Sequence, residues 1–571
     1  MRLQIIKSKN AASFYVVKSI RVGNKRTSKV IEKLGTYETL SQKLNGEDPI
    51  EWAKKYVEEL NRQEEEQTRT VIVKYSPVKI IPKGEQRTFN GGYLFLQKIY
   101  HELGLDKICK TISDRHKFSF DLNSILSRLI YGRIIYPSSK LSTFGLSENF
   151  IQPPNFEIQH IYRALGVIAK ETDFIQAELY KNSLNRYMRK TGIIYYDCTN
   201  YFFEIEQEEG LKQYGYSKEH RPNPLVQMGL FMDSDGIPLA FNINAGNTNE
   251  QVTMTPLEEK ILSDFNLSKF VVCTDAGLAS NNNRKFNDKG DRAFITTQSI
   301  KKLKAHLKEW TLEKSGWRLA NDPKKYDITE IDENDCKDKI YYKQRWIKEN
   351  GLEQKLIVTY SIKYRDYQRK IRAGQIERAE KLIKTNPTKL KKANANDYKR
   401  FILKTSFTNE GEIPQNDVYS INAEAIVKEE IFDGFYGVCT NLEDDAAEIV
   451  KINSRRWEIE ECFRIMKSEF KARPVYLGRD DRIAAHFTTC FIALMIYRFL
   501  EKKLNEQFTC HEITTGLRNM NFHELKGEGV IPSYTRTDFT DALHEIYGFR
   551  TDYQIVNTKQ LKNIFSITTS S

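Results

Sequence analysis

The pattern of apolar and polar positions divides the first 85 residues into strands and a helix. Residues 2–35 alternate as expected for an antiparallel ribbon with a turn at Gly23-Asn24. A helix is predicted at about 48–67, and residues 70–81 have the composition of a further strand. The ribbon is basic, which favours a small DNA-contacting module over a dimerisation arm, although both fit the pattern.

Between residues 91 and 190 the apolar residues recur at helical spacing, interrupted by Pro137 and by Pro153-Pro154. This pattern predicts three to five helices. The Arg and Lys residues interspersed along them would suit a DNA-binding bundle, and an ordinary helical spacer fits the same pattern equally well.

At Gly192 the pattern changes to strands. The run GIIYYDCTNYFFE is β-rich, and PLVQMGLFMD and IPLAFNINAG flank a hairpin turn at 234–236. A helix at about 251–264, the strand KFVVCTD, a second helix and the strand RAFITTQ follow. Three antiparallel strands followed by parallel strands alternating with helices is the order of a ribonuclease-H-like α/β core, so the sequence predicts an RNase-H-like mixed sheet.

Residues 311–425 interrupt that order with short strands and a strongly basic run. From residue 363 to residue 400 the chain carries 13 Lys or Arg and 4 acidic residues, a formal charge of +9. Such a run is usually a solvated face, but its density and its interleaved tyrosines favour a phosphate-binding surface. The strand FDGFYGVCTN then returns to the core, and one long helix is predicted at 446–471.

The predicted helix at 446–471 carries a seam of charged residues. Arg456, Glu460 and Lys467 are spaced so that, on a helix turning about 100° per residue, they share one narrow face, with Asn453 at its edge. The neighbouring Glu458 and Glu461 point elsewhere. Ordinary ion pairs at i,i+4 spacing explain the same pattern, so the seam alone does not establish a site.

Composition narrows the choice of partners. The chain of 571 residues is long enough for three or four compact units, and 88 basic against 76 acidic residues give a formal charge of +12. This charge points to a polyanionic partner. The eight cysteines show neither a C-x-x-C pair nor zinc spacing, which indicates buried thiols in a reducing cytosol. No run approaches the roughly 18 apolar residues that span a bilayer, so no membrane association is expected.

Two aspartates join Glu460 as candidate metal ligands. Asp197 interrupts an apolar strand, where an unpaired carboxylate would be costly, and Asp275 ends the strand that contains FVVC. Either aspartate could instead cap a turn. Two Asp from neighbouring strands and a Glu from a helix packed across them would supply the oxygen ligands that Mg²⁺ prefers. Two ions roughly 4 Å apart could then promote phosphoryl transfer without a protein nucleophile.

With these residues in place, the sequence resembles the bacterial insertion-sequence DDE transposases that carry a Tyr-x2-Arg-x3-Glu-x6-Lys signature and a β-rich insertion before the catalytic Glu. The resemblance covers about residues 190–505 and includes YYDCTNYFFE, GYSKEHRPNP, DGIPLAFNINAGNTNE, VVCTDAGLAS, FDGFYGVCTNL and RRWEIEECFRIMK. The N-terminal ribbon is similar to that of the longer members of this group.

The resemblance implies a metal-binding catalytic triad of Asp197, Asp275 and Glu460. The triad would hold two Mg²⁺ ions, which Mn²⁺ could replace. The implied chemistry is hydrolytic nicking at the element's ends, followed by attack of the freed 3′-hydroxyl on target DNA, with a hairpin intermediate in several members. The implied partners are double-stranded DNA, as terminal inverted repeats and as target, and a second copy of the chain in a synaptic homodimer.

Six residues are candidates for DNA contact. They are Arg456, Lys467, Asn453, Lys218, His220 and Arg221. The first two match the signature, whereas Asn453 stands where the signature has Tyr and can donate to a phosphate but offers no aromatic face. The last three lie in a loop between the first two core strands, where a solvated hairpin tip is the alternative.

These assignments predict a domain organisation and a function. The expected parts are an N-terminal ribbon and helix module (1–85), a helical DNA-binding domain (86–190), the two parts of the catalytic core (191–310 and 426–505), a β-rich insertion domain (311–425) and a C-terminal region without an assigned role (506–571). The predicted function is that of a cut-and-paste DNA transposase in the bacterial cytoplasm, associated with the nucleoid. An RNase-H-like DNA endonuclease without strand transfer and a catalytically silent DNA-binding regulator are the alternatives.

Overall fold

The computed structural model describes residues 1–8, 11–22, 25–44, 47–68, 71–72, 76–385, 396–407 and 416–570. They form two compact units, Met1–Glu85 and Gln86–Ser571. In the first unit, β1 (Arg2–Lys7), β2 (Ala12–Val22) and β3 (Lys25–Thr36) form an antiparallel sheet, followed by α1 (Tyr37–Lys43) and α2 (Pro49–Thr68). The predicted ribbon and helix are therefore confirmed, and the predicted turn at Gly23-Asn24 lies outside the described residues.

The strand predicted at 70–81 is absent from the described part of that segment. Residues 71–72 and 76–81 are neither helix nor strand. Pro77 cannot donate to a strand ladder, and Val78 and Ile80 are exposed, with no sheet face to cover them. A β-branched composition without a partner strand does not form a strand.

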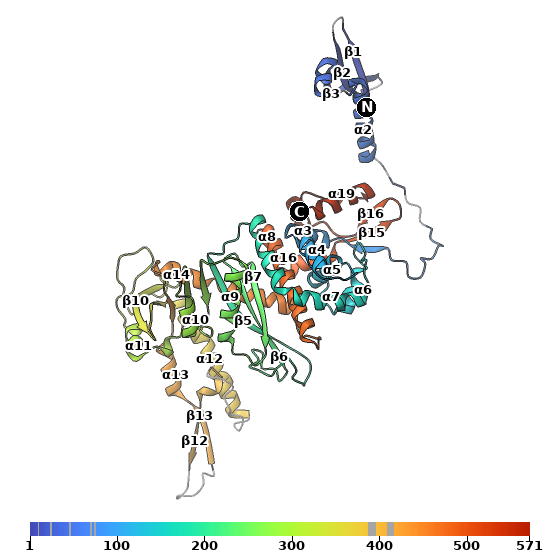
Figure 1. Ribbon diagram of the computed structural model, residues 1–571. Helices are drawn as coiled ribbons and strands as arrows, with labels where there is room; N and C mark the ends of the chain where they lie inside the picture. Colours follow the sequence, from blue (N-terminus) through green and yellow to red (C-terminus); the bar gives the residue numbers. More distant parts are fainter. Residues whose placement is uncertain are drawn as a thin grey trace. The chain divides into compact units, whose positions relative to one another are not determined.

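Helices of the second unit pack around one apolar helix (Figure 1). Those in contact with it are α3 (Tyr93–Glu102), α5 (Leu122–Ile135), α7 (Ile158–Lys170) and α8 (Thr172–Arg186), and α4 (Leu105–Arg115) and α6 (Lys140–Ser147) pack on these helices. The central helix is α16 (Asp480–Lys503), which by length and composition could cross a membrane, although 94% of its most apolar window is buried inside the protein. A helix that is apolar on all sides needs neighbours on all sides, so α16 serves as a core helix.

The strands predicted from Gly192 onward are the five adjacent strands at one end of an eight-stranded sheet. They are β5 (Ile193–Phe202), β6 (Leu225–Asp233), β7 (Pro238–Ala245), β8 (Phe270–Thr274) and β9 (Arg292–Gln298). Strands β5, β6 and β7 pair antiparallel, whereas β5, β8 and β9 pair parallel. Parallel neighbours need crossover connections, which contain α9 (Met254–Asp264) and α10 (Asn281–Phe286).

Three further strands widen the sheet beyond β9. The complete order is β10-β11-β14-β9-β8-β5-β6-β7, with β10 (Tyr341–Glu349), β11 (Leu352–Tyr360) and β14 (Phe435–Thr440). The first hairpin of the predicted insertion at 311–425, formed by β10 and β11, therefore belongs to the main sheet and not to a separate one. Strand pairing between distant segments cannot be inferred from the alternation within each one.

The remainder of that segment lies between β11 and β14 in sequence. It comprises α12 (Ile362–Thr385), β12 (Ile402–Phe407), β13 (Asn416–Ile421) and α13 (Ala423–Glu430). Among the described residues, strands β12 and β13 pair with each other and with no other strand, and they reach away from the main sheet (Figure 1). This part is therefore separate from the main sheet.

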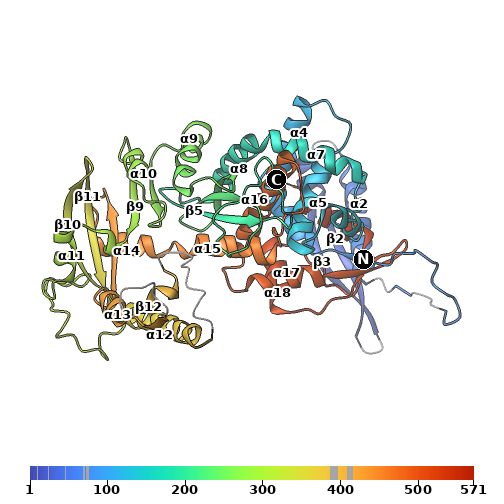
Figure 2. The ribbon, with the colours of Figure 1, turned by 90° about the horizontal axis from the view of Figure 1, so that it is seen from below.

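The prediction of a single helix at 446–471 is wrong. The segment forms two helices, α14 (Ala446–Ser454) and α15 (Trp457–Arg464), and a π-helical turn over Ile465–Glu469 follows. Helix α14 packs on β8, β9 and β10, whereas α15 packs on β5 (Figure 2). A twisted sheet turns its strands progressively, so one straight helix could not follow both areas.

The C-terminal region joins the helical part of the second unit. It contains α17 (Cys510–Asn519), β15 (Asn521–Leu525), β16 (Gly529–Pro532), α18 (Asp538–Tyr547), β17 (Val556–Asn557) and α19 (Thr558–Thr569). Its strands form a sheet in the order β17-β16-β15-β4, where β4 (Thr88–Asn90) comes from the start of the unit. Helices α17 and α19 pack on α5 and α3, so the region completes the helical core.

Candidate active site

One cleft of about 490 Å³ in the second unit brings the three predicted carboxylates together. Its lining residues are Asp197, Cys198, Thr199, Lys218, Glu219, Asp275, Arg456, Glu460, Phe463, Arg464, Lys467, Ser468 and Arg473. They come from β5, the loop after β5, the residue that follows β8, and the segment from Arg456 through α15 to Arg473. The fold therefore assembles the cleft from segments that are far apart in the sequence.

Asp197 lies within β5, between the neighbouring strands β6 and β8. Its Oδ1 accepts a hydrogen bond of 2.7 Å from the backbone N–H of Cys198. Burial raises the pKa of Asp197 to about 6, an effect that the charge of Lys218 opposes and the charge of Asp275 reinforces. The protein therefore does not fully offset the cost of burying the negative charge of Asp197, and a bound cation would stabilise its ionised form.

Asp275 follows directly after β8 and fits both interpretations of its sequence position. Its Oδ1 accepts hydrogen bonds from the backbone N–H groups of Gly277, at 2.9 Å, and Leu278, at 3.0 Å. It also lines the cleft beside Asp197. The turn contacts hold the carboxylate at the tip of the strand, which is where open α/β sheets keep their ligands.

Glu460 lies on α15 and is the third carboxylate of the cleft. It is exposed and makes no hydrogen bond or ion pair with the residues that the structure describes. Its neighbour Glu461 accepts a hydrogen bond of 2.7 Å from Arg464. Glu460 therefore has oxygen atoms available for a ligand, whereas Glu461 is already paired.

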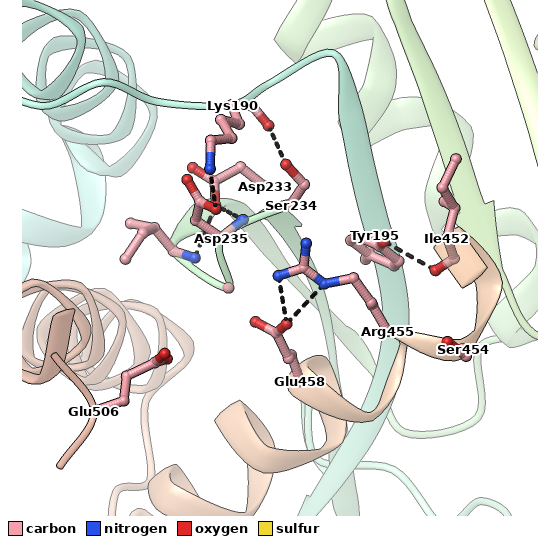
Figure 3. Close-up of polar contacts among 12 residues, drawn as sticks. Lys190, Tyr195, Asp233, Ser234, Asp235, Ile452, Ser454, Arg455, Glu458 and Glu506 are labelled. Carbon is pink, nitrogen blue, oxygen red and sulfur yellow. Dashed lines mark hydrogen bonds and ion pairs between the residues drawn. The ribbon is translucent and has the colours of Figure 1, made fainter. Parts of the chain in front are cut away.

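Glu458, two residues before Glu460, is buried and serves a structural role (Figure 3). Its Oε1 accepts a hydrogen bond of 2.9 Å from Arg455, and its Oε2 lies 3.6 Å from the guanidinium of Arg498 in α16. On the other side of the break, Tyr195 Oη donates to the carbonyl of Ile452 at 3.0 Å. These contacts fasten the α14–α15 junction to β5 and to α16, which fixes where Glu460 points.

Five Lys or Arg residues line the cleft beside the carboxylates, and three of them match the candidates predicted from the sequence. Arg456 Nη1 donates to Thr297 Oγ1 at 3.0 Å, and Lys467 Nζ donates to Thr199 Oγ1 at 2.6 Å. Lys467 lies in the π-helical turn, a distortion that is frequent at functional sites. Lys218 Nζ lies 3.2 Å from the carboxylate of Glu250 and donates to the carbonyl of Cys198.

The surroundings shift the pKa values of the two lysines in opposite directions. Burial, together with the like charge of Lys218, lowers the pKa of Lys467 to about 8. Desolvation opposes the protonation of Lys218, but the carboxylates of Asp197 and Glu250 outweigh it and raise the pKa of Lys218. Lys218 therefore stays charged at neutral pH. Lys467 titrates about one pH unit above neutrality, and an approaching anion would stabilise its charged form.

The remaining predicted DNA contacts are not in the cleft. Asn453 is only 4% exposed, and its amide donates to Tyr436 Oη at 2.9 Å, so its side chain is engaged inside the protein. His220 and Arg221 are exposed in the loop before β6. The Arg221 guanidinium lies 4.3 Å from the ring centre of Phe202.

Three cleft residues were not anticipated from the sequence. Thr199 lies two residues after Asp197, so strand alternation could have placed it on the same face. Glu219 lies 3.7 Å from Lys467 and also forms an ion pair with Arg473. No local signal identifies Glu219 or Arg473, because these two reach the cleft only through the tertiary fold.

Part of the basic run at 363–400 is neutralised inside the protein. Arg365 pairs with Glu333 at 2.6 Å, and Arg372, which is buried, donates to Asp433 at 2.7 Å. Residues 386–395 of the run lie outside the described residues. A phosphate-binding surface would therefore depend on the other basic residues of the run.

A second acidic group lies in the C-terminal region. Within the described part of the chain, Asp541, His544 and Asp552 are the group whose potential ligand atoms all lie within 4.8 Å of one another. Both carboxylates already accept hydrogen bonds from Arg550, at 3.2 and 2.6 Å. This group is an ion-pair network and lies away from the cleft lining.

Comparisons with known proteins gave one match to a family model and a similarity to a solved structure. Residues 351–496 match the family model of the transposase DDE domain, a range that contains Arg456, Glu460 and Lys467. Among solved structures, the chain is similar to one described as a cryo-EM structure of the piggyBac transposase synaptic complex with hairpin DNA. That alignment has 8% sequence identity and a TM-score of 0.36, and covers 85% of this chain and 88% of the other. No curated protein matches the chain.

Proposed function

We propose that this chain is a DDE transposase with an RNase-H-like core, which cleaves DNA at transposon ends and transfers the freed 3′-hydroxyl to target DNA in a cut-and-paste reaction. The observation that carries the proposal is the convergence of Asp197, Asp275 and Glu460 in one cleft, lined also by basic side chains. The match of residues 351–496 to the transposase DDE domain supports the same activity.

The donor set of the cleft fits a hard divalent cation. Asp197 has a raised pKa, Asp275 has only its Oδ1 engaged in the turn contacts, and Glu460 is exposed. We assign two Mg²⁺ ions, or Mn²⁺ in their place, to these three carboxylates. When bound, such ions supply Lewis-acid stabilisation of the charge that develops on the phosphoryl oxygens.

The basic residues of the cleft would bind and orient the DNA strand. Arg456 and Lys467 lie on either side of Glu460 in the sequence, and each is held by a threonine hydroxyl from the sheet. A DNA phosphate entering here would take the place of Glu219 beside Lys467. Charge complementarity of this kind positions a phosphodiester against the carboxylates without forming a covalent link to the protein.

The proposal also includes the partners and the setting. The substrates are double-stranded DNA, first the terminal inverted repeats and then the target, and two copies of the chain would hold two ends in a synaptic homodimer. We place the chain among the bacterial insertion-sequence enzymes with the Tyr-x2-Arg-x3-Glu-x6-Lys signature, acting at the nucleoid. Asn453, at the Tyr position of that signature, is left out of the DNA contacts because it is buried.

Reaction of the purified full chain with DNA carrying the inverted repeats that bracket its gene tests this function. In Mg²⁺, the wild type is expected to give cleaved ends and joined products. Glu460→Gln should abolish both while leaving DNA binding intact, and the matched control Glu461→Gln, which changes the neighbouring acid, should retain them. Cleavage without joining would favour a nuclease, and binding without cleavage would favour a regulator.

A further inference from the structure

A second pocket of the same unit, of about 600 Å³, is built from basic residues. Its lining residues are Arg133, Pro137, Ser138, Ser139, Lys140, Leu141, Tyr162, Lys471, Arg473, Pro474, Val475, Tyr476, Leu477, Gly478, Arg482 and His486. Five of these are Lys or Arg, and none is Asp or Glu. The helices α5, α6, α7 and α16 and the segment after the π-helical turn all contribute to the walls.

Lys140 is the most unusual of these cations. It is only 6% exposed and makes no hydrogen bond or ion pair with any residue that the structure describes. It is the first residue of α6, so the positive end of that helix also faces this region. A buried ammonium without a partner is costly, and burial and the nearby Arg133 lower the pKa of Lys140 to about 7.

Arg133 adds a second buried cation to the pocket. It is 4% exposed and uses its two Nη atoms to donate to the carbonyls of Phe470, at 3.0 Å, and Ser138, at 3.2 Å. Its Nε has no partner among the described residues. The carbonyls orient the guanidinium but do not neutralise its charge, so the pocket keeps a positive charge that the described protein does not balance.

The rim of the pocket is aromatic and apolar. Tyr476 is 73% exposed, and the guanidinium of Arg482 lies 5.1 Å from the ring centre of Tyr162. Faces of this kind stack on a sugar or base next to a phosphate. Arg473 lines both this pocket and the catalytic cleft, so the two are neighbours.

We propose that this pocket binds a phosphate group, held by Lys140, Arg133 and Arg482, and that in the DNA complex this group belongs to the backbone of the strand that leaves the catalytic cleft past Arg473. The assignment to DNA rests on the proposed function; the phosphate site does not. A phosphate would supply the negative charge that the pocket lacks, and charge-assisted hydrogen bonds to Lys and Arg are the strong ones. Free inorganic phosphate has the same chemistry, and the experiment separates the two sources.

The first arm measures thermal unfolding of the full chain in inorganic phosphate and in chloride at matched ionic strength. The wild type is expected to show a saturable rise of its unfolding midpoint that is specific to phosphate. Lys140→Met should lose that rise, with an unfolding midpoint in chloride equal to or above that of the wild type, because Met fills the space without a buried charge. Lys260→Met, which changes an exposed lysine of α9 paired with Asp173, should keep it. If Lys140→Met fails to fold, Arg482→Gln should weaken phosphate binding roughly tenfold.

The second arm measures binding of duplex DNA as a function of salt concentration. If the pocket takes a backbone phosphate, Lys140→Met should weaken binding to all sequences and reduce the salt slope by about one. Loss of phosphate stabilisation with unchanged DNA binding would support the phosphate site and assign it to a free anion. Equal effects of phosphate and chloride on the wild type, with unchanged DNA binding of Lys140→Met, would overturn the proposal. The first arm needs no cleavage, so an inactive transposase would leave this test intact.

Discussion

Asp197, within β5, and Asp275, directly after β8, lie at equivalent positions in the register of these two adjacent parallel strands. Tyr195 of β5 pairs with Cys273 of β8, and each aspartate lies two residues further along the chain. Because side chains alternate along a strand, each aspartate shares the face of the residue two before it. Tyr195 also donates to the carbonyl of Ile452 in α14, so this is the face over which α15 begins. The register of one strand pair thus brings two carboxylates under the helix that carries the third.

The raised pKa of Asp197 predicts how stability depends on pH without metal. In the unfolded chain Asp197 would titrate near its ordinary value of 3.8, whereas in the fold it titrates at about 6. Its contribution to the free energy of unfolding is therefore present at low pH and is lost as the pH rises through 6, by up to about 3 kcal/mol. Denaturant unfolding in EDTA should show Asp197→Asn to be more stable than the wild type at about pH 7 and similar to it at about pH 4. A wild type as stable as Asp197→Asn at both pH values would refute the shift.

Metal binding should offset the loss of stability that ionisation of Asp197 causes. At about pH 7 Mg²⁺ is expected to raise the unfolding midpoint of the wild type, because the cation compensates ionised Asp197. The rise should be smaller at about pH 5, where protons compete for Asp197, and absent in Asp197→Asn. Calorimetric titration of Mg²⁺ into the full chain measures the same coupling. Equal affinity of wild type and Asp197→Asn would place the metal elsewhere.

The two glutamates of α15 that are two residues apart should behave in opposite ways. Glu458→Gln removes one of the two carboxylates that pair with the buried guanidinium of Arg498, the other being Glu501, and is expected to lower the free energy of unfolding by about 1–3 kcal/mol. Glu460→Gln changes an exposed side chain, so its cost should be within about 0.5 kcal/mol. Urea unfolding of both variants checks this, and similar losses would show that the two side chains have been placed wrongly.

The lowered pKa of Lys467 predicts that DNA binding depends on pH. Its pKa of about 8 means that its positive charge is lost as the pH rises through that value, which removes one phosphate contact. DNA affinity of the wild type in metal-free buffer should fall roughly threefold to tenfold between about pH 7 and pH 9. Lys467→Arg, which stays protonated, should bind DNA with little change over the same range. Parallel pH profiles for the two proteins would argue against a role for Lys467 in phosphate binding.

The sequence predicted the parts of the site that depend on local pattern. Asp197 stands out because a carboxylate interrupts an apolar strand, and Asp275 because it ends one. Glu460 could be separated from Glu458 and Glu461 by helical geometry, and the structure agrees, since those two are paired with arginines. Such placements can be predicted because strand and helix periodicity decides which way neighbouring side chains point.

The features that the sequence did not reveal depend on contacts between distant segments. The break at Arg455–Arg456 follows from the twist of the sheet beneath the helix, and it leaves Asn453 buried against Tyr436, away from the charged seam. The extension of the main sheet by β10 and β11 arises from pairing with β14, more than 70 residues further along the chain. Nothing in the run around Lys140 indicates that its ammonium is buried.

The site of metal binding can be located directly by crystallography of the full chain soaked in Mn²⁺, using the anomalous scattering of the ion. The expected result is a peak in the cleft with carboxylate oxygens of Asp197, Asp275 and Glu460 at about 2.1 Å, the distance that such ions require. A peak only at Asp541, His544 and Asp552, or none at the three cleft carboxylates, would contradict the assignment of a catalytic metal site to this cleft.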